Sequence, residues 1–352
     1  MPSNQLKEDE INNHSLLSIS ILIPTLNSEN VLEDCLKSII KQDYPKDKIE
    51  IIIADGGSTD RTLDIASKYG ARIYENPLRT GEAGKAVALR HAGNEIAAFI
   101  DSDNILPQSN WLKKMVEPFE DEEIVGSEPL YYSYDKNKGY ITRYCALLGM
   151  NDPVCLFLGN YDRYSYLTGK WTELEIDQED KGAFLLIKLD GGNIPTIGAN
   201  GFLVRRNLLG SFEANDYLFD IDLVYELVVN GYKKLAKVKI GIIHIFSGSI
   251  STFIRKQRRR IRDYNYYKRL KLRKYPWGSV NRLKLIEFII YTILILPLLL
   301  QSVIGYLKKK DIAWFFHIPA CWITLVVYTY ESLLSSIAPP KPDGNSRLKG
   351  QK

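Results

Sequence analysis

Residues 95–104 read EIAAFIDSDN, so an apolar run ends in two carboxylates one residue apart, Asp101 and Asp103. Alternate side chains of a strand point to the same side, which lets these two carboxylates lie together. They repel each other unless a positive charge lies between them, and a divalent cation bound to a phosphate supplies that charge. A helix N-cap is the competing interpretation, because Asp and Asn also begin helices and residues 105–119 have a helical pattern.

Strands and helices alternate along the chain before this point. Apolar runs at residues 18–24, 49–55, 71–76 and 95–101 are separated by segments with helical spacing or helix caps, at residues 31–42, 56–70 and 81–93. A near-continuous apolar run is typical of a strand that is buried on both faces. The alternation predicts an α/β fold in which a parallel sheet carries helices on both sides.

Polar residues follow three of these strands. Thr25 and Asn27 come after the first, Asp55 after the second, and Asp101 and Asp103 after the fourth. Parallel α/β sheets bind ligands at the carboxyl ends of their strands. The convergence therefore predicts one shared site and favours the metal interpretation over the N-cap.

The net charge of +4 is mild but unevenly distributed, because nearly every second residue from Arg255 to Lys274 is Lys or Arg. Tyrosines interleave with this run and an apolar segment follows it, so we expect an interfacial helix on anionic lipid and no nucleic-acid partner. The four cysteines show no metal-binding spacing and are expected to be reduced thiols in a cytosolic setting. The polar start predicts no secretory signal.

Two long apolar segments follow, residues 285–306 and 312–337, joined by a Lys-rich turn at residues 308–311. A bilayer is crossed by roughly 20 residues, so both are long enough. We expect a two-helix membrane hairpin over residues 283–337, and a pair of buried or interfacial helices is the alternative. Whether the hairpin crosses the bilayer or lies in it is left open.

The middle of the chain, residues 128–200, is dense in aromatic side chains, most of which we expect in the core. Residues 172–176 and 183–189 are predicted to pair as a hairpin around the charged loop 177–182. Trp171 precedes this hairpin and is a candidate contact for a sugar ring or a lipid tail.

Taken in order, the motifs resemble the family 2 glycosyltransferases of GT-A fold, in a membrane-anchored branch. The segments that carry the resemblance are IPTLNSE (23–29), IIIADGGSTDRT (51–62), RTGEAGKAVALRHAGNEIAAFIDSDN (79–104), IGANGFLVRR (197–206), FDIDLVYELVVNGYK (219–233) and FIRKQRRRIRDY (253–264). Together they cover most of residues 18–264. Each alone is loose, and their order and spacing carry the assignment.

The resemblance implies an inverting transfer of a sugar from a nucleoside diphosphate donor to an acceptor hydroxyl, with Asp220 as the catalytic base. Asp101, Asp103 and His244 are the implied ligands of Mg²⁺ or Mn²⁺. The implied donor-binding residues are Pro24, Thr25, Asn27, Glu29, Asp55, Gly84, Lys85, Asp101, Ser102, Gln257 and Arg260. The implied acceptor-side residues are Gly198, Ala199, Asn200, Gly201 and Trp171.

Two positions depart from the family pattern. Phe219 stands where the family usually has a glutamate before the base, and Ile261 stands where processive members have the tryptophan of Q-x-x-R-W. The second departure favours transfer of a single sugar over polysaccharide synthesis. Asp222 is the nearest competitor for the role of base, and a helix N-cap is the alternative interpretation of Asp220.

The expected organisation is a polar tail (1–17), a GT-A domain (18–250) with a donor-binding half (18–127) and an acceptor half (128–250), a basic interfacial segment (251–282), the hairpin (283–337) and a flexible tail (338–352). The expected activity is glycosyl transfer to a lipid or lipid-linked acceptor, with the catalytic domain on the cytoplasmic side of the membrane. A non-catalytic scaffold that binds nucleotide sugars is one alternative. A sugar nucleotidyltransferase is another, although residues 25–35 lack the glycine-rich loop with Arg and Lys that it would need.

Overall fold

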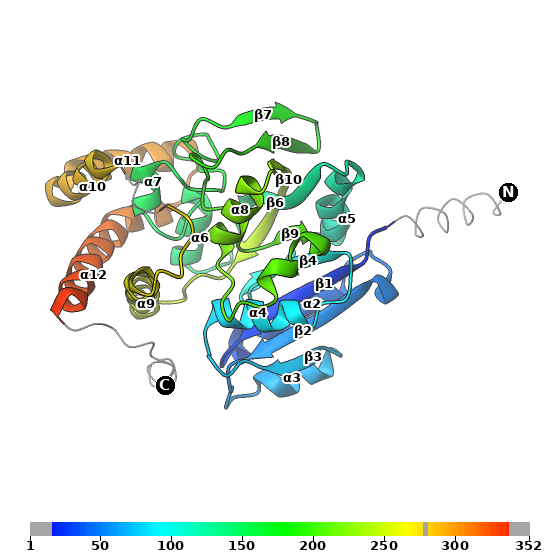
Figure 1. The fold of residues 1–352 in the computed structure, drawn as a ribbon. Coiled ribbons are helices and arrows are strands. Elements are labelled where there is room, and N and C mark those ends of the chain that lie inside the picture. Colours follow the sequence, from blue (N-terminus) through cyan, green and yellow to red (C-terminus); the bar gives the residue numbers. More distant parts are fainter. Residues whose placement is uncertain (1–15, 277–280, 338–352) are drawn as a thin grey trace.

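The computed structural model describes residues 16–276 and 281–337, so the predicted tails lie almost entirely outside the described residues. Ten strands form one mixed sheet, drawn in Figure 1. Its order is β3 (Arg72–Glu75), β2 (Ile49–Asp55), β1 (Ile19–Thr25), β4 (Ile96–Phe99), β9 (Phe202–Arg205), β6 (Ile124–Tyr132), β10 (Lys234–His244), β8 (Phe184–Lys188) and β7 (Asp177–Asp180), with β5 (Asn104–Ile105) paired to β10.

The first four strands, β1 to β4, pair in parallel, as the alternating pattern predicts. Ile21 of β1 lies beside Ile51 of β2 on one side and Ala98 of β4 on the other. Successive side chains of β1 enter opposite cores, with Ile21 packed under α2 (Glu29–Ile40) and α5 (Trp111–Val116) and Leu22 under α4 (Gly81–Arg90) and α8 (Asp220–Val229). The sheet thus has helices on both faces, and α3 (Thr62–Lys68) completes the first half.

The second half of the sheet is mixed. β9 is antiparallel to both β4 and β6, and β10 is parallel to β6. β6 and β10 therefore run in the same direction as β4, so the carboxyl end of β10 lies at the same sheet edge as the carboxyl end of β4. That edge carries the candidate site.

The predicted hairpin exists, but its first strand is displaced. β7 covers Asp177–Asp180, which the sequence pattern assigns to the loop, and residues 172–176 form no strand. The reason is the turn: Gly182 adopts a positive φ of 83°, so the chain reverses within residues 181–183 and the charged segment pairs directly with β8.

The C-terminal helices differ from the expected two-helix hairpin. The apolar segment 285–306 is broken into α10 (Arg282–Leu294) and α11 (Leu296–Lys308), which meet at 90°. Ile295 has a φ of 62° at the break, and Pro297 follows in the first turn of α11, where its missing N–H is tolerated. Among the described residues, Ile312–Ile337 is the one helical segment that is long and apolar enough to cross a membrane unbroken; it comprises a short 3₁₀ turn and α12 (His317–Ile337).

Three further helices join the sheet and its flanking helices to this region. α6 (Tyr140–Leu148) and α7 (Val154–Leu158) pack against α11, α12 and α10, and α9 (Ile250–Arg269) lies along α12. α9 lies in the segment predicted to be a basic interfacial helix, and it begins six residues after the end of β10. The helices α10, α11 and α12 gather on one side of the molecule, away from α3 and α5 (Figure 1).

We predict that Gly84→Ala lowers the thermal unfolding midpoint by a few degrees. A Cβ at this position would lie 2.7 Å from Cβ of Pro24, so α4 must move away from β1. Overpacking of this kind costs about 1–3 kcal/mol, which exceeds the gain of up to about 1 kcal/mol from replacing a helical glycine by alanine.

Gly81→Ala in the same helix is the matched control, because no atom lies within 4 Å of its added Cβ. Circular dichroism on heating checks both variants. If Gly84→Ala melts at or above the temperature of Gly81→Ala, then the close approach of α4 to β1 is not rigid.

Candidate active site

Asp101 and Asp103 lie in a turn between β4 and β5, not at the start of a helix. The next helix, α5, begins at Trp111 with Asn110 at its N-cap. The side chain of Asn104 closes the turn by accepting a hydrogen bond of 3.0 Å from the backbone N–H of Asp101. β5 then pairs with β10, which sets Asn104 opposite His244. The N-cap interpretation of the two carboxylates is therefore wrong.

Two basic side chains lie beside Asp103, one at the end of β10 and one on α9. Nζ of Lys256, on α9, lies 3.1 Å from its Oδ2, and Nε2 of His244 lies 3.3 Å from its Oδ1. Burial by itself would raise the pKa of Asp103, but the charge of Lys256 and the contact with His244 outweigh it and hold the pKa below its ordinary value. Asp103 is therefore a carboxylate.

Asp220 begins α8 beside the same turn. Nζ of Lys85, on α4, lies 2.5 Å from Oδ1 of Asp220 and 3.9 Å from Oδ1 of Asp101. Burial raises the pKa of Asp220 to about 6, although the ion pair with Lys85 acts in the opposite direction. Phe219 occupies the N-cap position of the helix, and no side chain caps it. The carboxylate of Asp220 is thus not engaged in capping.

The two neighbours of Asp220 that the sequence singled out have structural contacts. Asp222 accepts hydrogen bonds from the backbone N–H groups of Lys274 and Tyr275, at 2.5 and 2.7 Å, and so holds the segment after α9. Phe219 packs edge-on against the ring of Tyr267 on α9, with ring centres 4.7 Å apart. An aromatic anchor for α9 thus stands where the family usually has a second carboxylate.

The residues predicted to bind the donor in the loops after β1 and β2 lie close together. Asp55 accepts hydrogen bonds from the hydroxyl of Thr25 (2.8 Å) and from the backbone N–H groups of Gly57 and Ser58 (2.9 and 2.7 Å). Asn27, with a φ of 49°, accepts a hydrogen bond of 2.8 Å from the backbone N–H of Thr59. These contacts tie the loop after β1 to the loop after β2.

Other predicted donor residues extend the same surface. Glu29 accepts a hydrogen bond from the backbone N–H of Arg61, at 3.2 Å. The hydroxyl of Ser102 donates to that of Ser28 at 3.2 Å, which joins the Asp101 turn to the start of α2. Gly84 and Pro24 form the close contact between α4 and β1.

The loop of residues 198–201, predicted to lie on the acceptor side, bridges the end of β4 and the start of α8. Gly198 has a φ of 120°, and a Cβ on it would lie 2.6 Å from the carbonyl oxygen of Asp220. Gly201 has a φ of 93° and donates its backbone N–H to the carbonyl of Phe99 at 2.9 Å. Both positions require glycine, and the loop fixes where Asp220 stands.

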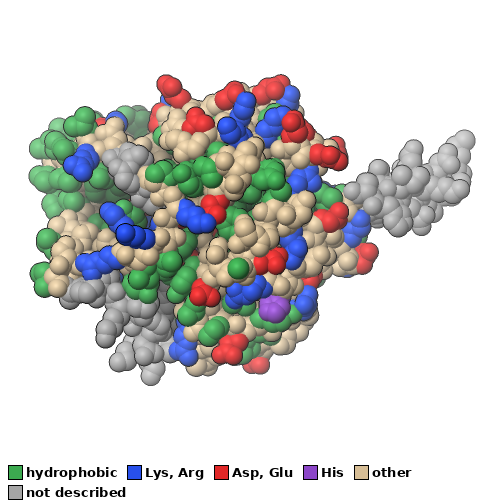
Figure 2. Space-filling view, in the orientation of Figure 1, with side chains coloured by type: hydrophobic (Ala, Val, Ile, Leu, Met, Phe, Trp, Pro, Cys, Tyr) green, Lys and Arg blue, Asp and Glu red, His purple; other side chains and the backbone are tan. Residues whose placement is uncertain are grey.

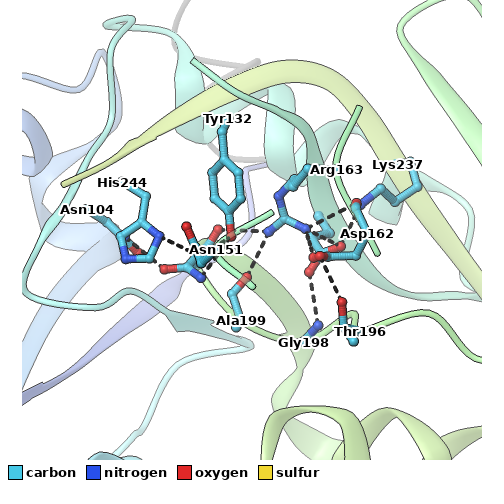
Figure 3. A network of polar contacts seen from close by, with 12 residues as sticks. Asn104, Tyr132, Asn151, Asp162, Arg163, Thr196, Gly198, Ala199, Lys237 and His244 are labelled. Carbon is cyan, nitrogen blue, oxygen red and sulfur yellow. Dashed lines mark hydrogen bonds and ion pairs between the residues drawn. The ribbon is translucent and has the colours of Figure 1, made fainter. Parts of the chain in front are cut away.

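A buried network of charges supports this loop (Figure 3). The carboxylate of Glu128 on β6 lies 2.8 Å from Arg163 and 2.6 Å from Lys237 of β10, and it also accepts the backbone N–H of Gly198 at 2.9 Å. Nη2 of Arg163 donates to the carbonyl of Ala199 at 2.9 Å. Glu128, Arg163 and Lys237 are each at most 1% exposed, so their charges must be balanced within the network. Nε of Arg163 is buried without a hydrogen bond.

The network continues toward the Asp101 turn through neutral groups. Oδ1 of Asn200 accepts a hydrogen bond of 3.0 Å from Asn104, and its Nδ2 donates to the hydroxyl of Tyr132 at 3.2 Å. Nδ2 of Asn151 lies 3.2 Å from Nδ1 of His244 (Figure 3). One connected set of contacts thus runs from Lys237 to His244 beneath the site.

The fit of a divalent metal rests on few side chains. No group of three or more His, Cys, Asp or Glu side chains among residues 16–276 and 281–337 is arranged to hold a metal ion, so the implied trio of Asp101, Asp103 and His244 is not a preformed site. Asp101 turns toward Lys85, whereas Asp103 turns toward His244 and Lys256. Oδ1 of Asp103 is buried and makes no hydrogen bond, although Nε2 of His244 lies 3.3 Å from it. One or two carboxylates completed by substrate phosphates and water are an ordinary Mg²⁺ site, and these residues fit that kind.

Comparison with known proteins assigns the chain to a family. A profile of glycosyl transferase family 2 matches residues 20–211, more than half of the sequence. The chain belongs to glycosyl transferase family 2. The match begins in β1 and ends after β9, so it includes the Asp101 turn and the 198–201 loop, as the motifs predict.

Two curated relatives match over shorter segments. The poly(ribitol-phosphate) beta-N-acetylglucosaminyltransferase TarS of Staphylococcus aureus is 36% identical over 97 residues, which are 26% of this chain and 17% of that protein. The dolichyl N-acetyl-alpha-D-glucosaminyl phosphate 3-beta-D-2,3-diacetamido-2,3-dideoxy-beta-D-glucuronosyltransferase of Methanococcus voltae is 32% identical over 109 residues, 29% of this chain and 34% of that protein. The chain thus matches at most 34% of the length of either.

Among solved structures, the mannosyltransferase PcManGT of Pyrobaculum calidifontis, in complex with GDP-Man and Mn²⁺, aligns with 96% of this chain and 80% of its own. The TM-score is 0.48 and the sequence identity is 16%.

Three residues implied by the family resemblance lie apart from the carboxylates. Trp171 is buried in the core, and its Nε1 donates to Gln178 at 2.9 Å. Gln257 is buried too and donates to the carbonyl of Asn151 at 3.1 Å, while Arg260 donates to Gln257 at 2.6 Å. The described contacts of these three side chains hold α9 and the core together, and their roles toward donor or acceptor stay predictions.

Lys256 is a residue of the candidate site that the sequence did not single out. It precedes Gln257 by one residue, and the register of α9 directs it and not Gln257 to Asp103. Glu128, Arg163 and Lys237 were missed as well. A signal exists for Glu128, which is the one charged residue of segment 124–132. Lys237 is one of three lysines in segment 234–244, so the sequence does not single it out.

We predict that Arg163→Met destabilises the protein strongly. The substitution leaves Glu128 and Asp162 with Lys237 as their remaining cation and frees the carbonyls of the 198–201 loop. Removal of one partner from a buried ion pair costs about 3–5 kcal/mol. Unfolding in guanidinium chloride, followed by fluorescence, measures the loss.

Lys181→Met breaks the exposed pair with Glu179 and serves as the control, with an expected loss of at most about 1 kcal/mol. Equal losses in the two variants would contradict a supporting role for the network.

Proposed function

We propose that this chain is an inverting glycosyltransferase that moves one sugar from a nucleoside diphosphate donor to a hydroxyl of a lipid or lipid-linked acceptor at a membrane. The observation that carries the proposal is the position of Asp220. It is held by Lys85 and Gly198 within one cluster with Asp101, and burial raises its pKa to about 6. A carboxylate with a pKa near neutrality is suited to accept a proton from a hydroxyl.

The donor is proposed to lie over the carboxyl ends of β1, β2 and β4. The tied loops at Thr25, Asn27 and Asp55 offer a rigid surface for the nucleoside. Asp101 and Asp103 would hold a Mg²⁺ or Mn²⁺ ion beside the diphosphate. A bound ion of this kind neutralises the charge that develops on the leaving diphosphate.

In the proposed reaction the acceptor oxygen forms a bond to the anomeric carbon as the bond from that carbon to the diphosphate breaks. The diphosphate leaves with the electron pair, and the acceptor proton passes to Asp220. Attack from the face opposite the leaving group inverts the anomeric carbon. Lys85, between Asp220 and Asp101, keeps the base in place and balances its charge.

Support for a lipid-linked acceptor comes from the C-terminal helices and from the relatives. The printed name of the Methanococcus voltae enzyme describes transfer to a dolichyl-phosphate-linked sugar, whereas that of TarS describes a poly(ribitol-phosphate). A hollow of about 660 Å³ lies between α7, the segment 192–194 and α10, with Leu156, Phe157 and Ile194 among its walls. We propose that it receives part of the acceptor, because residue 194 leads directly to the 198–201 loop.

We predict that Asp220→Asn lowers kcat by at least about a hundredfold and changes donor affinity little, since a general base contributes about 10²–10⁴-fold. In the unmodified chain kcat/KM should fall about tenfold per pH unit below pH 6, because protonation of Asp220, with its pKa of about 6, removes the base. Transfer from a radiolabelled donor, measured from pH 5 to 8, checks both expectations.

Asp216→Asn, an exposed position four residues earlier, makes the same change of charge and should leave both quantities unaltered. A parallel loss of donor binding and activity in Asp220→Asn would remove Asp220 from the role of base.

We predict that Asp103→Asn abolishes metal-dependent donor binding. Calorimetric titration with UDP-, GDP- and dTDP-sugars, with and without Mn²⁺, identifies the donor in the unmodified chain and tests the variant. Mass spectrometry of added membrane lipids then shows whether one of them gains a single sugar. Donor binding without transfer to any lipid would point to another acceptor or to a non-catalytic scaffold, and metal-independent binding would exclude the role given to Asp103.

A further inference from the structure

The turn between the two apolar C-terminal segments, residues 308–311, is fastened to residues 16–249, which hold the candidate site (the catalytic part). Asp311 accepts hydrogen bonds from Nε of Arg143 on α6 at 2.8 Å and from the hydroxyl of Tyr134 at 2.6 Å. Nζ of Lys308 donates to the carbonyl of Leu167 at 2.6 Å. A membrane hairpin that crosses the bilayer twice would set this turn on the opposite side of the membrane, away from these partners.

The second half of α10 also packs against this part of the chain. Phe288 and Tyr291 of α10 pack edge-on against Phe157 of α7, with ring centres 5.2 and 5.6 Å apart. At the start of α10, Asn281 and Lys284 line one hollow with Glu173 and Asn193. The chain thus leaves the catalytic part near residue 282 and returns to it near residue 308.

Between these anchors the two helices are too short to cross a bilayer. Each has 13 residues, or about 20 Å at 1.5 Å per residue, against a hydrocarbon core of about 30 Å. Because they meet at 90°, the apex of the pair reaches only about 14 Å from the line joining its ends if both helices tilt equally. Leu294 and Leu296 flank this apex and are 61% and 62% exposed.

The helix α12 is long enough to cross a membrane, but its partner is not apolar. Glu331 of α12, which is buried, pairs with Arg258 and Arg262 of α9 at 2.8 and 2.7 Å. Arginines in the middle of a bilayer are unfavourable, so a bilayer that surrounded α12 would have to accommodate the charges of α9. The exposed side of α12 is instead an apolar stripe, formed by Trp322, Val326, Tyr330, Leu333 and Ile337.

We propose that α10 and α11 form a re-entrant wedge that enters one leaflet of an anionic bilayer and returns, while α12 lies along the same membrane surface. The occupant of the exposed apolar faces is thus lipid. Lysine and arginine side chains stand at both ends of the wedge, at Arg282, Lys284 and residues 308–310, where lipid headgroups would meet them. Figure 2 shows apolar side chains gathered at the edge of the molecule that α10 and α11 form in Figure 1.

This inference deepens the membrane location in the proposed function, because it sets the catalytic part at a fixed height above a single leaflet. Of the two arrangements left open for the predicted hairpin, crossing the bilayer or lying in it, the proposal favours the second, in which residues 308–311 stay on the catalytic side. Its tests do not measure catalytic activity. They can therefore fail while the glycosyltransferase proposal stands, and they can succeed even if that proposal fails.

The first test is the sidedness of the turn. In the full chain carrying Cys155→Ser, one variant has Lys310→Cys and a second has Lys181→Cys, on the exposed β7–β8 turn of the catalytic part. Sealed inverted and right-side-out vesicles are treated with a membrane-impermeant maleimide. We expect both cysteines to be labelled in the same vesicle preparation and protected in the other.

Labelling of the two cysteines in opposite preparations would show a crossing hairpin and overturn the proposal. So would recovery of the chain from cells without detergent as a stable dimer, because a second copy would then cover the apolar faces.

The second test is binding of the purified chain to phosphatidylcholine vesicles with and without phosphatidylglycerol. Leu294→Glu with Leu296→Glu should weaken binding roughly a hundredfold or more, because two leucines leave the hydrocarbon. The matched control, Val229→Glu with Leu63→Glu, alters two exposed apolar residues of the catalytic part and should bind as the unmodified chain does. Equal binding of the two double variants would overturn the wedge.

Discussion

The carboxylate of Glu128 is the interaction on which the site depends. Two buried cations, Arg163 and Lys237, share it, and neither has access to water. Buried charges are stabilised by hydrogen bonds to their polar atoms, and here the backbone of residues 198–200 supplies three of them. The chain therefore cannot move this loop without uncovering charge, and the loop in turn holds the first residue of α8.

Local patterns were sufficient for the first half of the fold. The strands and helices up to β4 follow from apolar runs and helical spacing, and the meeting of Thr25, Asp55 and Asp101 follows from the geometry of parallel strands. The second half depends on pairings between distant segments, such as β9 between β4 and β6. No periodicity within a segment specifies its partner, so the network around Glu128 was not predictable from composition or spacing.

Two errors have more specific causes. An apolar run indicates only that a segment avoids water, so residues 285–306 suggested one membrane helix. Pro297, however, lies in the first turn of a second helix. At α9, the family pattern identified the helix but not its rotation, and a difference of one residue sets Lys256 against Asp103 and turns Gln257 toward Asn151. Rotation depends on what the opposite face packs against, here α12 and its buried Glu331.

Under the proposed function, the 198–201 loop also limits how acceptor preference can be re-engineered. Gly198 and Gly201 leave no room for a side chain, and Asn200 is buried with both ends of its amide engaged. Ala199 is the one residue of the four that is partly exposed, and its contact with Arg163 uses only its backbone carbonyl. A saturation library confined to this codon samples new side chains beside Asp220 at little risk to folding, whereas randomising the whole loop would yield mostly unfolded protein.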